Sequence, residues 1–236
     1  MSSILFDLDN TLTHRDKSIS YYSEEFVRVY QSSFSCSVDS SWVARKIIEV
    51  DNGGYGGHDL RCQMLSELAM WSDVPSRRQL LDHWFSWFPS HPIPMPGMIH
   101  TLRQLKSIGF KLGVVSNGKS ELQRTKLTAL GIVSLLDCIV ISGDIGVKKP
   151  SSEIFKHALD QLACEPQDAI FVGDHPQNDY IASLNVGMTP IWFSGFREWP
   201  DGTEPPSQVV DSLELVLEVV QDITNQSSGT MIATEV

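Results

Sequence analysis

The second half of the sequence repeats one pattern, in which a short apolar run is followed by a stretch with helical periodicity. The runs are "KLGVVS" (111–116), "CIVIS" (138–142), "AIFVGD" (169–174) and "TPIWFS" (189–194). Between them, apolar residues recur three or four positions apart, which is typical of a helix that buries one face. Runs that are apolar throughout indicate strands buried on both sides, as in a parallel sheet covered by helices. We therefore predict an α/β fold with a doubly wound, Rossmann-like parallel sheet.

The first part of the chain departs from this pattern. "ILFDLD" (4–9) has the character of another buried strand, but residues 14–94 contain helical patterns such as "SWVARKIIEV" and no clear strand. Connections between a strand and the next helix are usually about 2–6 residues long, so this insert is too long to be a loop. We predict an α/β core domain of residues 1–13 and 95–236, and a helical cap domain of residues 14–94 inserted after the first strand.

The composition narrows the range of partners. The chain has 18 basic and 29 acidic residues and a net charge of −11, which argues against nucleic acid or an anionic membrane surface as a partner. No apolar run approaches the roughly 20 residues that cross a bilayer, and no signal peptide is evident. The four cysteines form no CxxC pair, which favours reduced thiols. We expect a cytoplasmic protein, either a monomer or a homodimer.

Reactive residue types gather where the predicted strands end. In doubly wound sheets the ligand site lies at the carboxyl ends of the strands. The residues found there are Asp7, Asp9, Ser116, Asn117, the pair Lys148 and Lys149, Asp174 and Asp179. Several carboxylates in one crevice require a counter-charge, and oxygen ligands suit Mg²⁺. One carboxylate can attack phosphorus, another can transfer protons, and hydroxyl and lysine groups can hold phosphoryl oxygens. The set predicts a phosphoryl-transfer site.

Four motifs in this order resemble those of the haloacid dehalogenase-like hydrolase superfamily. They are "DLDNT" (7–11), "VVSNG" (114–118), "KKP" (148–150) and "VGDHPQND" (172–179). The helical insert between the first two motifs resembles the cap of the cap-type-1 members. The resemblance implies a Mg²⁺-dependent phosphatase that hydrolyses a small phosphorylated metabolite through an aspartyl-phosphate intermediate.

The same resemblance assigns roles to residues of this sequence. The expected catalytic residues are Asp7 as nucleophile, Asp9 as general acid and base, and Lys149. The expected phosphate-binding residues are Ser116, Asn117 and Gly118. The expected metal ligands are Asp7, Asp9 through its backbone carbonyl, Asp174 and Asp179, the last either through water or as an anchor. In the cap, the Gly-rich segment "NGGYGGHDLR" (52–61) suggests a loop over a site, with substrate contacts from Tyr55, His58 and Arg61.

Three other reactions fit parts of this pattern. A haloacid dehalogenase would use the same nucleophile on carbon, but enzymes of that branch typically lack an aspartate at the position of Asp9. A phosphoglucomutase-like isomerase would share the core and differ in its cap contacts. A phosphonate hydrolase would need a cap lysine that forms a Schiff base, and nothing singles out Lys17 or Lys46 for that role.

Overall fold

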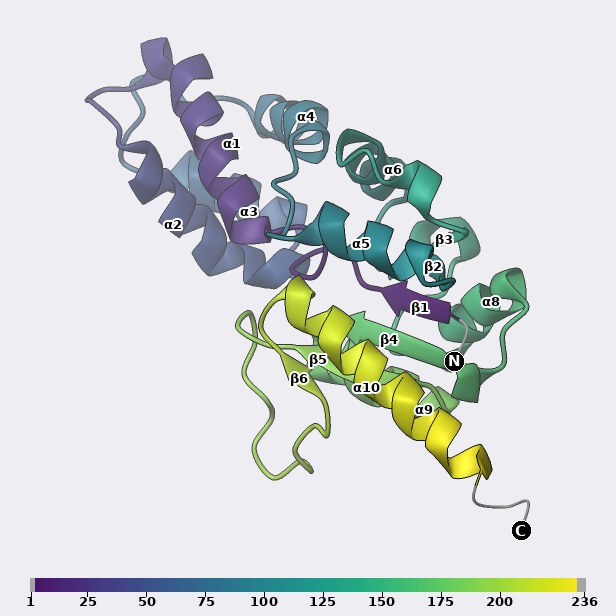
Figure 1. The fold of residues 1–236 in the computed structure, drawn as a ribbon. Helices are drawn as coiled ribbons and strands as arrows, with labels where there is room; N and C mark the ends of the chain where they lie inside the picture. Colours follow the sequence, from purple (N-terminus) through teal and green to yellow (C-terminus); the bar gives the residue numbers. More distant parts are fainter. Residues whose placement is uncertain (1–2, 233–236) are drawn as a thin grey trace. The chain divides into compact units, whose positions relative to one another are not determined.

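A computed structural model describes residues 3–232, with side chains described as far as residue 224. These residues form a parallel sheet with the strand order β3-β2-β1-β4-β5-β6 (Figure 1). The strands are β1 (Ser3–Phe6), β2 (Lys111–Ser116), β3 (Cys138–Ile141), β4 (Ala169–Gly173), β5 (Thr189–Phe193) and β6 (Val209–Val210). Helices cover both faces of the sheet, so the predicted doubly wound α/β fold is confirmed.

The helices follow the strands in the alternation that the sequence predicts. The α-helices are α1 (Arg15–Val29), α2 (Ser40–Asp51), α3 (His58–Glu67), α4 (Arg77–Trp87), α5 (Met98–Ser107), α6 (Ser120–Ala129), α7 (Ser142–Ile145), α8 (Ser152–Leu162), α9 (Ala182–Val186) and α10 (Leu213–Ile232). The shorter turns are η1 (Gln31–Ser33), η2 (Asn52–Gly54), η3 (Phe88–Ser90), η4 (Val133–Leu135), η5 (Pro166–Asp168) and the π-helical η6 (Pro176–Ile181). Within the described part of the chain, no helix combines the length and apolar character that a membrane crossing requires.

The order of the strands creates a crevice at the centre of the sheet. β1 pairs with β2 on one side and with β4 on the other, and Leu5 lies opposite both Gly113 and Phe171. The chain winds outward from β1 through β2 to β3, and then crosses to β4 on the far side of β1. Ligands bind at such reversals, beyond the carboxyl ends of the two diverging strands. Asp7 follows β1 and Asp174 follows β4, so both lie at this point.

The helices on both faces of the sheet bury their apolar sides against the strands, which stabilises these elements. α8 and α9 pack on one face, whereas α5 and α10 lie together on the other (Figure 1). The inward positions predicted for α8, including Ile154 and Phe155, are fully buried against strand residues such as Phe171. Each such side chain contributes roughly 1.5–3 kcal/mol through burial. The hydroxyl of Thr101 on α5 donates to the carbonyl oxygen of Leu213 on α10 at 3.0 Å.

The chain divides into two compact units. One contains residues Met1–Leu12, Met95–Ser120 and Ile132–Val236, and the other contains Thr13–Pro94 and Glu121–Gly131. The second unit is helical and includes most of α6, which the sequence pattern assigns to the core domain. Within it, α1–α4 enclose an aromatic cluster in which the rings of Trp84 and Phe88 stack at 4.0 Å and Tyr22 meets Trp84 edge-on at 4.7 Å.

Candidate active site

Three aspartates meet at the reversal of the sheet. The backbone N–H of Asp7 donates to the carbonyl oxygen of Val172 at 2.9 Å, so the pairing of β1 with β4 extends to the reactive residue. Asp7, Asp174 and Asp179 are all buried, and each offers a carboxylate oxygen within 4.8 Å of the others. Three negative charges at this distance destabilise one another unless positive charge lies among them.

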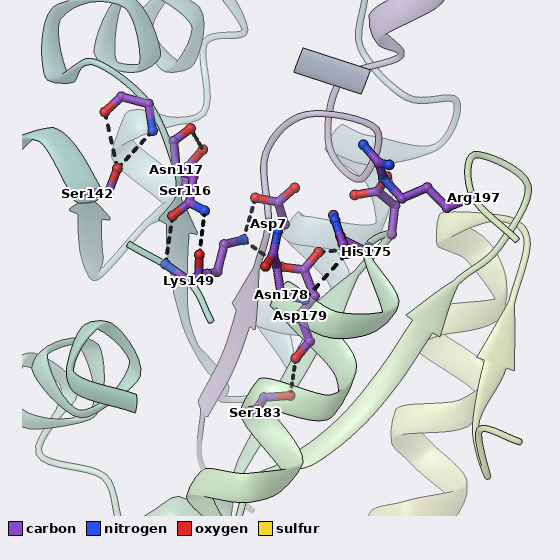
Figure 2. A network of polar contacts seen from close by, with 12 residues as sticks. Asp7, Ser116, Asn117, Ser142, Lys149, His175, Asn178, Asp179, Ser183 and Arg197 are labelled. Carbon is purple, nitrogen blue, oxygen red and sulfur yellow. Dashed lines mark hydrogen bonds and ion pairs between the residues drawn. The ribbon is translucent and has the colours of Figure 1, made fainter. Parts of the chain in front are cut away.

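Lys149 supplies part of that positive charge. Its ammonium donates to Asp7 Oδ1 and to Asp179 Oδ1, both at 2.7 Å (Figure 2). The lysine is 2% exposed although it lies on a connection between two helices. The structure therefore places Lys149, the lysine next to the proline, at the aspartates that the sequence assigns to the same site.

Asn117 holds the backbone of Lys149. Its Oδ1 accepts from the Lys149 backbone N–H at 2.8 Å, and its Nδ2 donates to the Lys149 carbonyl oxygen at 2.9 Å. The amide thus pairs with the lysine backbone as a neighbouring strand would, and it fixes the point from which the ammonium extends. The sequence motif predicts a phosphate contact for Asn117 but gives no sign of this pairing, because the partner lies 32 positions away.

The other expected phosphate-binding groups lie at the same strand end. Ser116 is the last residue of β2 and is buried, and its Oγ lies 3.5 Å from the Asn117 carbonyl oxygen, at the limit of a hydrogen bond. The backbone N–H of Gly118 donates to Ser142 Oγ at 2.9 Å. A phosphate contact from these groups stays a prediction.

Asp179 reaches the cluster through a wide turn. It lies in the π-helical η6, and its backbone N–H donates to the His175 carbonyl oxygen at 2.9 Å. Its Oδ2 accepts from the His175 backbone N–H at 2.9 Å. A Cβ atom at Gly173 would lie 2.5 Å from Asp179 Cβ and Cγ. Such contacts are impossible, so the close approach of Asp179 to the end of β4 requires glycine at position 173.

The loop after Asp7 carries Asp9. Asn10 adopts a left-handed conformation with φ of 62°, and the Leu12 backbone N–H donates to the Leu8 carbonyl oxygen at 3.0 Å. Asparagine tolerates this conformation better than most residues, which favours a tight turn here. Asp9 is half-buried, and its charge is one of the influences that raise the pKa of Asp7.

The electrostatics of the cluster indicate a shortage of positive charge. Burial raises the pKa of Asp7 from 3.8 to about 7, although Lys149 opposes this shift. Burial also raises the pKa of Asp174 well above its usual range, and the charges of Asp179 and Asp7 add to the effect. A divalent cation bound by oxygen ligands would reverse these shifts. The three carboxylates have the donor type and spacing that such an ion requires.

Arg197 lies beside the cluster, and the sequence motifs do not include it. Its Nε is 3.6 Å from Asp174 Oδ2. The indole N–H of Trp192 donates to the Asp174 carbonyl oxygen at 2.9 Å. The signal that could have found both residues is the strand-end rule, because "TPIWFS" is also a buried strand and Arg197 follows it.

The cap residues singled out by the sequence differ in exposure. Within the helical unit, Tyr55 is 48% exposed and follows three residues in left-handed conformations. Arg61 is 2% exposed, donates to Asp51 Oδ1 at 3.1 Å and lies 3.5 Å above the ring centroid of Trp84. His58 Nδ1 is 3.2 Å from Arg61 Nη1. Arg61 therefore contributes to the interior of the helical unit, and substrate contacts from these residues stay predictions.

Comparisons with known proteins find one family along most of the chain. The family model described as haloacid dehalogenase-like hydrolase matches residues 4–193. A glyceraldehyde 3-phosphate phosphatase from Methanothermobacter thermautotrophicus is 35% identical over 131 residues, so the alignment spans only 56% of each chain. One from Methanocaldococcus jannaschii is 26% identical over 94% of this chain and 98% of its own. A magnesium-bound putative hydrolase from Bacillus subtilis has the same fold, with a TM-score of 0.68 at 18% identity over 93% of this chain and 98% of its own.

Proposed function

This chain belongs to the haloacid dehalogenase-like hydrolases, and from that premise we propose that it is a Mg²⁺-dependent phosphatase of a small phosphorylated metabolite. The observation that carries the proposal is the position of the Lys149 ammonium, 2.7 Å from both Asp7 and Asp179. A nucleophilic carboxylate held by a lysine, with further carboxylates beside it, supplies the parts of a phosphoryl-transfer site. The similarity to glyceraldehyde 3-phosphate phosphatases supports a phosphate monoester as substrate.

Asp7 is the proposed nucleophile. One of its carboxylate oxygens forms a bond to phosphorus while the bond from phosphorus to the ester oxygen breaks, and an aspartyl phosphate results. Asp9 donates a proton to the leaving oxygen, and then accepts one from the water that attacks the aspartyl phosphate. Inorganic phosphate leaves and Asp7 is regenerated. Lys149 orients the Asp7 carboxylate and counters its charge.

The metal would be held by the carboxylates of Asp7 and Asp174 and by the backbone carbonyl of Asp9. Bound Mg²⁺ would neutralise the carboxylates and stabilise the charge on the phosphoryl oxygens. Asp179 accepts from Lys149 at one oxygen and from the His175 backbone at the other. These two hydrogen bonds favour Asp179 as an anchor, or as a ligand through water, over a direct ligand.

The helical unit is the proposed cap that shields the leaving group during the reaction. We propose that Tyr55, His58 and Arg61 contact the leaving group, and that Arg61 also supports the loop through its hydrogen bond to Asp51. Ser116, with the amides near it, is proposed to bind the phosphoryl oxygens. The four cysteines are present as thiols, which supports a cytoplasmic enzyme, and we propose a monomer or homodimer.

The test is a panel of phosphorylated metabolites assayed for phosphate release with Mg²⁺ and with EDTA. Wild-type protein should release phosphate only with Mg²⁺, and Asp7→Asn and Asp9→Asn should not turn over. Asp160→Asn is the matched control, because Asp160 is exposed on α8. Metal-independent release of halide from 2-haloacids, without phosphate release, would overturn the proposal in favour of a dehalogenase. Transfer of phosphate within a sugar phosphate would identify an isomerase.

A further inference from the structure

The connection between β5 and β6 is fixed against the acidic cluster by aromatic side chains. The ring of Trp199 packs edge-on against Trp192 and against Tyr180, each with 5.1 Å between ring centroids. Trp192 is bound to the backbone of Asp174, and Tyr180 directly follows Asp179. The Tyr180 hydroxyl also accepts from the Ser207 backbone N–H at 2.8 Å. The connection is therefore attached at several points to the residues that position the two aspartates.

This attachment sets the position of Arg197. The guanidinium Nε lies 3.6 Å from Asp174 Oδ2, and the side chain is 19% exposed. In the view of Figure 2, Asp7 lies between Lys149 and Arg197. Lys149, from the connection between α7 and α8, contacts Asp7 and Asp179, whereas Arg197, from the connection after β5, lies beside Asp174.

The two cations are suited to different tasks. The Lys149 ammonium is almost fully buried and donates to two carboxylates. Arg197 is more exposed, and its contact with Asp174 is longer than a hydrogen bond. A guanidinium presents five donors in a planar fork that matches two oxygens of a phosphate or carboxylate. The carboxylates of the cluster outnumber these two cations, so the site would attract an anion once the proposed metal is bound, and Arg197 would then add positive charge for the anion to contact.

We propose that Arg197 is a substrate-binding residue that recognises an oxyanion of the substrate. The inference rests on the proposed phosphatase function and adds a residue to it. The oxyanion is either the phosphoryl group itself or a carboxylate on the leaving group. Both present paired oxygens to the same guanidinium, so substrates with and without a carboxylate must distinguish them.

The experiment compares wild type, Arg197→Gln and Arg197→Lys at saturating Mg²⁺. The substrates are phosphoglycolate, which has a carboxylate, and ethyl phosphate, which has none. Arg197→Gln should raise KM roughly tenfold or more, as expected for loss of a charge-assisted hydrogen bond, and Arg197→Lys should recover part of the loss. Arg103→Gln makes the same charge change at an exposed position on α5 and should leave KM unchanged.

The pattern of the effect identifies the oxyanion. A rise in KM for both substrates assigns Arg197 to the phosphoryl group, and a rise for phosphoglycolate alone assigns it to the carboxylate. Trp199→Leu should raise KM in the same direction by a smaller factor, because it loosens the attachment of the connection. Unchanged KM in Arg197→Gln would overturn the inference while leaving the phosphatase function standing.

Two further measurements separate other roles. Calorimetric titration with Mg²⁺ alone should show binding by Arg197→Gln at least as tight as by wild type, because the substitution removes a positive charge 3.6 Å from Asp174 Oδ2. Weaker Mg²⁺ binding with unchanged KM would contradict substrate binding and make Arg197 a positioning residue for Asp174. If wild type hydrolyses no phosphate ester, the proposed function fails by itself. Calorimetry with inorganic phosphate then tests Arg197 directly, and equal binding by wild type and Arg197→Gln would refute its role.

Discussion

The two units of the molecule each bury a cluster of charged side chains, but with opposite imbalance. In the α/β unit, the carboxylates of Asp7, Asp174 and Asp179 gather around Lys149. In the helical unit, one carboxylate, Asp51, is paired with two guanidiniums. Both clusters are buried and contain the same kinds of groups. Negative charge is in excess in the Asp7 cluster, and positive charge is in excess in the Asp51 cluster.

The difference shows in the acidity of the carboxyl groups. Burial raises the pKa of Asp7 to about 7 despite Lys149. Burial also acts to raise the pKa of Asp51, but hydrogen bonds and charges from Arg15 and Arg61 outweigh it and lower that pKa. The guanidinium of Arg61 also lies against the ring of Trp84. The Asp51 cluster links three helices and a loop. The Asp7 cluster has unbalanced negative charge, which a bound metal ion can neutralise.

The largest expected effect is a loss of activity, without a loss of folded structure, when Asp7 of the first cluster is replaced. Asp7→Asn should lower kcat by roughly 10⁴-fold or more, because the nucleophile is lost. Its circular dichroism spectrum should match that of wild type, because the substitution removes one of several like charges. The measurement is phosphate release at saturating substrate and Mg²⁺. Residual activity within tenfold of wild type would show that Asp7 does not attack phosphorus.

The next effect is on stability at the second cluster. Asp51→Asn leaves two buried guanidiniums without a carboxylate and should destabilise the helical unit by about 3–5 kcal/mol. The measurement is urea unfolding followed by tryptophan fluorescence. Asp82→Asn is the control, because Asp82 pairs with Arg78 on the surface and should cost about 0.5 kcal/mol or less. Equal unfolding midpoints for the two variants would contradict the structural role of Asp51.

A smaller effect is expected where a neutral side chain supports the first cluster. Asn117→Ala removes both hydrogen bonds to the Lys149 backbone and should lower kcat by about 10–100-fold, as loss of a supporting partner does at other sites. Asn117→Asp keeps the acceptor and loses the donor, so it should fall between alanine and wild type. Steady-state kinetics measure the change. If the alanine variant changes KM alone, Asn117 contacts substrate and does not position the lysine.

The smallest expected effect is the change in the free energy of unfolding with pH, and its sign differs between the two clusters. The folded-state pKa of Asp7 is raised, so its contribution to stability is present below about pH 4 and is lost as the pH rises through about 7. In EDTA, Asp7→Asn should therefore gain stability over wild type across that range, by at most about 1.4 kcal/mol per pH unit for one proton.

The lowered pKa of Asp51 predicts the opposite sign. Its contribution is present above the unfolded pKa near 3.8 and is lost as the pH falls through the folded value. Urea midpoints measured from pH 3 to pH 8 test both statements. A stability difference between Asp7→Asn and wild type that does not change with pH would contradict the imbalance described for the first cluster.

The sequence predicts the parts of the site that depend on topology. Parallel strands end at one edge of a sheet, so Asp7 and Asp174 meet once the strands are recognised. The sequence does not predict how side chains pair across long separations. Asn117 has the pattern of a phosphate ligand, and the pattern gives no sign that its side-chain amide pairs with the backbone of Lys149. Arg61 has the pattern of a loop contact, and the pattern gives no sign that it is buried beside Asp51.

Arg197 illustrates a second limit. Its position depends on Trp199 packing between Trp192 and Tyr180, and no local spacing encodes a contact of that kind. Motifs near strand ends are short and regular, so a pattern can find them. Long connections take their shape from tertiary packing, and only the structure places their side chains.

Gly173 has one more consequence. The space that a methyl group would need at this position is filled by the carboxylate-bearing carbon of Asp179. Gly173 and Asp179 therefore compete for the same space. Any larger side chain at position 173 would displace the carboxyl group of Asp179. A substitution at Gly173 would alter the position of Asp179 without changing any charged group, so the geometry of the acidic cluster depends on a residue that has no side chain.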